Sequence, residues 1–176
     1  MKPEFKKYLS GHRFWWRVLT VFMAVLCVVF VICAIAGRDV QYTGLVCFAG
    51  ILGASLIPQF LFAKYLKKLE SDSRFPQIQE DFARSFPMFN DTLRFGNTWI
   101  FRKGKKILTY ADIRQVYQHI QKTNFIESER RLVYVNRNGK IDTLCNLQLR
   151  GKSDEELMKA IALIHSKNPG VKIGYR

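Results

Sequence analysis

The chain has 176 residues, a length that suits one or two domains. Its 28 Lys and Arg residues outnumber 14 Asp and Glu residues, and the net charge of +14 favours an anionic partner, either nucleic acid or an anionic membrane surface. The four cysteines form no C-x-x-C pair and have no zinc-finger spacing, so they indicate neither a disulfide framework nor a zinc site.

Residues 1–17 form a basic segment that precedes two long apolar runs. Residues 18–36 and 43–63 contain no charged side chain. A helix of 19 residues covers about 28 Å, enough for the hydrocarbon core of a bilayer. Because only a short loop separates the runs, we expect a transmembrane hairpin of two antiparallel helices. Signal-peptide cleavage after "AIAG" at 34–37 is disfavoured, because the apolar stretch is too long and a second span follows.

The basic residues on either side of the runs predict an orientation. Eight Lys and Arg residues flank the hairpin, whereas the connecting loop contains only Arg38. The positive-inside rule therefore predicts that both termini are cytoplasmic.

Small residues recur at helical spacing in both runs and predict close packing of the two helices. The candidate packing residues are Ala24, Cys27, Ala49, Gly50, Gly53 and Ala54. Neither run contains an ionisable residue, so the pattern indicates an anchor rather than an ion or substrate path.

Residues 64–90 are predicted to form a helical linker, and a change to period-two patterning predicts strands in residues 91–176. Turn candidates are "GNT" at 96–98, "KGK" at 103–105 and "RNGK" at 137–140. The Asn-Gly pair suits a two-residue type I′ hairpin, in which Tyr134 would face Thr143.

The last helix is the clearest element. Ser153 and Glu156 form a capping box, and Leu157, Ile161 and Ile164 form an apolar stripe. The residues "VKIGYR" after it can return as a short strand. We therefore predict an α+β protein in which an antiparallel sheet or partial barrel is closed by a C-terminal helix.

The runs "TLRFGNTWIF", "ILTYADIRQVYQ" and "LVYVNRNGKIDTL", followed by a helix, "KNP" and a "GY" tail, resemble a family. The family comprises bacterial two-span membrane proteins with a cytoplasmic pleckstrin-homology-like (PH-like) domain. The resemblance implies a PH-like fold over residues 91–176 and a place in the bacterial inner membrane. It supplies no catalytic or binding residues, since the family is of unknown function.

The stretch "RKGKK" gathers four basic residues around Gly104, which we place at a bend with positive φ. Two interpretations stay open. The stretch is either a solvated hairpin turn or a weak patch that faces an anionic lipid surface. The candidate lipid-surface residues are Arg102, Lys103, Lys105 and Lys106.

No motif for catalysis or phosphate binding occurs, so we expect no enzyme, cofactor or metal. Nucleic-acid binding is disfavoured, because the basic residues cluster around one turn and the chain is expected to be anchored. We therefore predict a membrane-anchored interaction module that binds a protein or peptide partner, or the anionic membrane surface. The alternative is a structural or assembly subunit of a membrane complex, in which the helical hairpin binds the partner or a second copy.

Overall fold

The structure is a computed structural model that describes residues 1–11, 13–36, 42–123, 126–147 and 153–174. The chain divides into two compact units. One unit combines Met1–Leu9 with Pro76–Arg176, and the other contains Ser10–Phe75.

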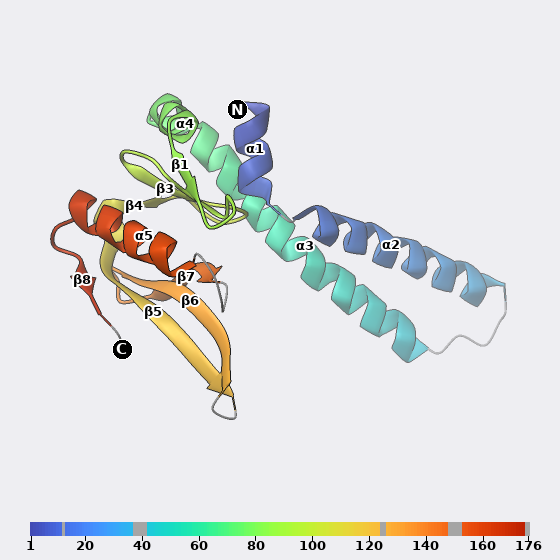
Figure 1. Ribbon diagram of the computed structural model, residues 1–176. Coiled ribbons are helices and arrows are strands. Elements are labelled where there is room, and N and C mark those ends of the chain that lie inside the picture. The colour runs from blue at the N-terminus through green and yellow to red at the C-terminus, as the bar shows by residue number, and fades with distance from the viewer. Residues whose placement is uncertain (12, 37–41, 124–125, 148–152, 175–176) are drawn as a thin grey trace. The chain divides into compact units, whose positions relative to one another are not determined.

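The unit Ser10–Phe75 consists of helices α2 (Arg13–Ile35) and α3 (Tyr42–Glu70), which lie side by side (Figure 1). The amide Nε2 of Gln59 on α3 donates a hydrogen bond to Oγ1 of Thr20 on α2 at 2.7 Å. Many large apolar side chains of both helices are exposed, among them Phe22, Phe60 and Leu61.

The prediction of a transmembrane hairpin is contradicted. Over the residues that the structure describes, no helix is long and apolar enough to cross a membrane, whereas a span needs about 20 consecutive, predominantly apolar residues. The predicted spans at 18–36 and 43–63 are therefore not supported. Two further predictions depended on those spans, namely integration into a membrane and an inner-membrane location with both termini in the cytoplasm. The same finding contradicts both.

The other unit contains two four-stranded sheets rather than the single sheet or partial barrel that we predicted. The first sheet is antiparallel and has the order β1 (Phe86–Met88), β2 (Leu93–Phe95), β3 (Trp99–Arg102), β4 (Leu108–Thr109). The second has the order β7 (Ile141–Leu147), β6 (Ile126–Asn136), β5 (Ile113–Thr123), β8 (Lys172–Ile173). Strand β8 pairs with β5 in parallel, and the other pairs of this sheet are antiparallel.

Helix α5 (Ser153–Lys167) lies across the second sheet (Figure 1). Its residues Leu157, Ala160 and Ile164 are buried in one core with side chains of both sheets. The 3-10 helix η1 (Tyr110–Asp112) connects the sheets, and the Tyr110 hydroxyl donates to the carbonyl of Gly96 at 2.8 Å. The predicted C-terminal helix and its apolar stripe are confirmed, although Ile161 is only partly buried.

Two short helices, α1 (Pro3–Ser10) and α4 (Phe75–Ala83), contribute aromatic side chains to the first sheet. Phe5 and Phe82 each contact Phe101 on β3, with ring centroids 5.9 Å and 5.2 Å from that ring. The hydroxyl of Tyr8 donates to the carbonyls of Thr92 and Phe101, each at 3.1 Å. The N-terminal residues thus belong to the packed domain, a role that sequence analysis did not assign to them.

The hairpin at "RNGK" has a different register from the predicted one. Tyr134 pairs with Asp142, whereas we expected it to face Thr143. The N–H of Asn136 donates to the carbonyl of Lys140 at 2.9 Å, and Gly139 adopts φ 77°. Three residues therefore form the loop, with glycine in the left-handed conformation, which is the type I turn plus bulge of three-residue hairpins.

Candidate functional site

A groove lies between β5 and the N-terminal half of α5. It has a volume of about 430 Å³ and is bordered on a third side by the end of β8. Its apolar lining residues are Tyr117, Leu157, Met158, Ile161 and Ile173. Met158 and Ile173 remain 67% and 53% exposed, although both are large apolar side chains. The groove therefore offers apolar surface that a ligand side chain could cover.

A network of polar and charged side chains also lines the groove. Arg130 on β6 lies 2.6 Å from Asp154 on α5 and 2.9 Å from Glu127, and its side chain is 13% exposed. With its amide oxygen turned toward this guanidinium, Gln118 accepts from Arg130 at 2.5 Å and 2.8 Å. These contacts hold the Arg130 side chain in place beside the groove.

One edge of β5 lies next to the groove. This strand has 11 residues and pairs along its length with β6, apart from register shifts. On its other edge, β8 pairs only with Gln115 and Val116. Among the described strands, none continues along this edge past Val116. Such an edge is a template for an added extended chain.

The basic stretch 102–106 does not present four converging cations. Arg102 is buried and lies 2.7 Å from Asp142, and Lys105 donates to the carbonyl of Thr143 at 2.9 Å. Lys103 and Lys106 are exposed. Gly104 adopts φ 71° at the bend, which confirms its predicted position in the turn. The lipid-surface role of the four residues stays a prediction, but two of them are engaged by β7.

The burial around Asp142 changes the pKa of neighbouring groups. Burial lowers the pKa of Lys105, and the nearby Asp142 carboxylate offsets part of that effect. Burial alone would raise the pKa of Asp142, yet the hydrogen bond and the positive charge of Arg102 outweigh it and lower that pKa. Burial raises the pKa of the Cys145 thiol to about 12. The cluster thus holds charges that stabilise one another, and its thiol is poorly suited to nucleophilic chemistry.

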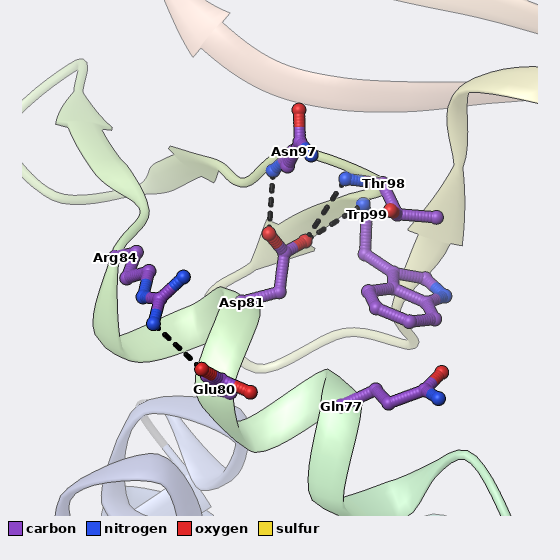
Figure 2. A pocket seen from close by; sticks show the side chains of 7 residues that line it. All are labelled: Gln77, Glu80, Asp81, Arg84, Asn97, Thr98 and Trp99. Carbon is purple, nitrogen blue, oxygen red and sulfur yellow. Dashed lines mark hydrogen bonds and ion pairs between the residues drawn. The ribbon is translucent and has the colours of Figure 1, made fainter.

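A second, polar pocket of about 440 Å³ lies between α4 and the turn from β2 to β3 (Figure 2). The carboxylate of Asp81 accepts three backbone N–H groups, from Asn97 at 2.6 Å, Thr98 at 3.0 Å and Trp99 at 3.1 Å. Figure 2 shows this carboxylate pointing into the turn, whereas Glu80 turns away to Arg84. Since Asp81 already fills the cluster of donors, we interpret this contact as the one that fixes α4 to the first sheet.

The residues predicted to pack the helices are only partly visible in the structure. Ala24 and Cys27 are half-buried on α2. Gly50 and Gly53 are exposed, and a methyl group added at either would meet no atom within 4 Å apart from the neighbouring backbone of its own helix. The side chains of Ala49 and Ala54 lie outside the described residues. The packing role of this set stays a prediction.

Within the described residues, no group of three or more His, Cys, Asp or Glu side chains could hold a metal ion. His119 and His165 are both exposed. Sequence analysis missed the β5–α5 groove, because its walls come from segments about 40 residues apart. The available signal was the alternation of "VKI", which predicted a strand but not its partner.

Comparisons with known protein families, with curated proteins and with solved structures found no match.

Proposed function

We propose that this protein is an interaction module that binds an extended segment of a partner protein. The segment adds to the outer edge of β5 and places side chains in the groove between β5 and α5. The observation that carries the proposal is the position of a strand edge directly beside an apolar groove.

The backbone supports this mode of binding. An added strand gains affinity from main-chain hydrogen bonds, whatever its sequence, and specificity from alternate side chains. Ile120 lies on the part of β5 beyond β8 and is 39% exposed, so a strand placed there would cover apolar surface as well.

The groove supports a protein rather than a lipid partner. Its apolar lining suits Leu, Ile, Val or Phe side chains, and its charged groups are paired with each other. The four basic residues of the stretch 102–106 do not act together toward a lipid surface, because Arg102 and Lys105 bond to residues of β7. PH-like domains, which the sequence resembles, also serve as protein-binding modules.

The experiment is a peptide-library selection on the purified full-length chain, followed by affinity measurements with the best peptide. Met158→Asp places a charge in the groove at a residue that is already 67% exposed, so folding should survive. We expect at least a tenfold loss of affinity, equivalent to about 1.4 kcal/mol. Lys159→Asp places a carboxylate at the next position of α5, which does not line the groove, and should change affinity less than threefold.

Two results would contradict the proposal. One is a selection that yields no peptide whose binding depends on Met158. The other is equal loss of affinity in the Met158→Asp and Lys159→Asp variants, which would place the binding surface elsewhere.

A second candidate function is that of an assembly subunit, with α2 and α3 as the partner-binding part. The observation that favours it is their exposed apolar surface, where Phe22 is 59% and Phe60 70% exposed. A helix pair that exposes this many large apolar side chains is suited to association with a partner. Light scattering tests it for a second copy. The mass should exceed the 20.5 kDa of one chain and fall toward that value in Phe60→Lys, and a wild-type monomer would exclude self-assembly.

A further inference from the structure

The residues that connect α5 to β8 are held in place by hydrogen bonds and by burial in the core. The amide Nδ2 of Asn168 donates to the carbonyls of Tyr110 at 2.9 Å and Ile113 at 2.8 Å. The N–H of Val171 donates to the carbonyl of Asn168 at 3.0 Å, and the Val171 side chain is buried in the main core. The direction in which the chain leaves α5 is therefore fixed, and it leads onto the edge of β5.

The residues that follow are held much less firmly. Lys172 and Ile173 are both exposed, and they pair with only Gln115 and Val116. The N–H of Gly174 donates to the carbonyl of Val116 at 3.3 Å, which is beyond the usual range for such bonds. Strand β8 thus occupies the start of the β5 edge with little to hold it there.

The side chains of this segment alternate as a strand requires. Val171 is buried in the core and Ile173 lines the groove, so both lie toward α5, whereas Lys172 between them points the other way. The segment therefore alternates apolar, polar and apolar residues and directs only the apolar ones toward α5, while it runs parallel to β5.

We infer that residues 171–174 are an internal mimic of the partner segment and compete with it for the edge of β5. This inference rests on the proposed function and specifies its ligand. The partner is an extended segment with apolar residues two positions apart, which runs parallel to β5 and seats an aliphatic side chain where Ile173 now lies. Displacement of β8 lengthens the available edge back to Gln115, while Asn168 keeps the displaced residues nearby as a competitor.

The test uses a fluorescein-labelled peptide with the sequence GVKIGYR, which copies residues 170–176. Its affinity is measured by fluorescence anisotropy for the full-length chain and for a chain that ends at Pro169. We expect at least tenfold tighter binding to the shortened chain, because its own competitor is gone. A peptide with the equivalent of Ile173→Asp should bind the shortened chain at least tenfold more weakly than GVKIGYR.

A second variant guards against misfolding of the shortened chain, which loses the buried Val171. Gly174→Pro in the full-length chain removes the N–H that bonds to Val116 but retains Val171 in the core. It should strengthen binding of GVKIGYR at least threefold. Lys172→Ala should leave this binding unchanged, because the Lys172 side chain is exposed and points away from α5.

Equal binding of GVKIGYR to the full-length chain, the shortened chain and Gly174→Pro would overturn the inference. So would equal binding of the two peptides to the shortened chain. If library peptides bind through Met158 while removal of the tail has no effect, the proposed function stands and this inference falls. If GVKIGYR binds only the shortened chain and the library yields no groove-dependent peptide, the β5 edge accepts only the chain's own tail, and the proposed function and this inference both fall.

Discussion

The guanidinium of Arg102 on β3 lies 2.7 Å from the carboxylate of Asp142 on β7, so one ion pair joins the two sheets. Arg102 also donates to the carbonyls of Lys106 at 3.2 Å and Thr143 at 3.3 Å, and its side chain is 6% exposed. A buried guanidinium that donates to several acceptors stabilises the fold rather than attracting an anionic surface. This relationship changes how the basic stretch 102–106 is interpreted.

The first prediction concerns the stability that this pair provides. Arg102→Ala should lower the free energy of unfolding by about 2–3 kcal/mol, because three acceptors lose a charged donor. This is less than the 3–5 kcal/mol typical of a fully buried pair, since the Asp142 side chain is 40% exposed. Lys103→Ala, at an exposed position of the same turn, should change stability by less than about 0.5 kcal/mol. Urea unfolding of both variants measures the difference, and equal effects would show that Arg102 has no special role.

The second prediction is a dependence on pH that belongs to Asp142. Its pKa is lowered in the folded chain, so this carboxylate contributes stability above its unfolded pKa of about 3.9. The contribution is lost as the pH falls through the lower, folded pKa. Asp142→Asn should therefore be less stable than the wild type at pH 7, and the gap should narrow as the pH falls below about 4.

Urea midpoints at a series of pH values measure this gap. Glu80→Gln serves as the control, because it removes a carboxylate from an exposed pair with Arg84. A constant gap between wild type and Asp142→Asn across the acid range would show that the ion pair is not the cause.

The third prediction concerns the carboxylate of Asp81, which accepts three N–H groups of residues 97–99 (Figure 2). Asp81→Ala should cost about 1–3 kcal/mol, because these donors lose a charged acceptor. Glu80→Ala, the neighbouring residue in an exposed pair, should cost less than about 0.5 kcal/mol.

Gly96 gives a sharper test of the same contact. A Cβ atom at Gly96 would overlap the Asp81 carboxylate. Gly96→Ala should therefore be destabilising in the wild type, yet much less so in the Asp81→Ala background. A double-mutant cycle should show a coupling energy of at least about 0.5 kcal/mol, and additive effects would contradict the close approach.

The strands and the last helix could be predicted because their signals are local. Period-two alternation and turn glycines indicated β2, β3 and the bend at Gly104, which has the expected positive φ. The stripe through Leu157 and Ile164 indicated the buried face of α5, and both residues are in the core.

Other features depend on partners far away in the sequence and could not be read from local patterns. Phe5, Tyr8 and Leu9 have helical spacing, but their burial requires Phe82 and Phe101 from α4 and β3. Glu156 was predicted to cap its own helix, yet its carboxylate accepts the N–H of Phe89 at 3.1 Å.

The "RNGK" loop shows how a correct turn can still give a wrong register. Asn-Gly predicted a hairpin, and a hairpin is present, but the loop contains three residues rather than two. The shift moves Asp142 opposite Tyr134, whose hydroxyl donates to it at 3.3 Å. The acceptor for Arg102 was therefore hidden from the sequence, because the extra loop residue shifts the pairs from Val135 to Val133, up to the register shift after which Leu132 pairs with Cys145.

The final prediction separates the two roles of α5, which closes the core and lines the groove. Ile164 is fully buried, whereas Ile161 is partly buried and lines the groove. Ile164→Ala should lower the free energy of unfolding by about 2–5 kcal/mol, because it removes buried apolar atoms and leaves a cavity. Ile161→Ala should cost less than half as much, since part of its side chain is already in contact with water.

Binding should follow the opposite order. At a temperature where all variants are folded, Ile161→Ala should weaken binding of the library-selected peptide at least threefold, whereas Ile164→Ala should leave it within twofold of wild type. Chemical unfolding measures the first comparison and fluorescence anisotropy the second, with Lys159→Ala as the control for both. If Ile161→Ala destabilises the fold as much as Ile164→Ala and does not affect binding, Ile161 belongs to the core alone, and the groove does not extend to this turn of α5.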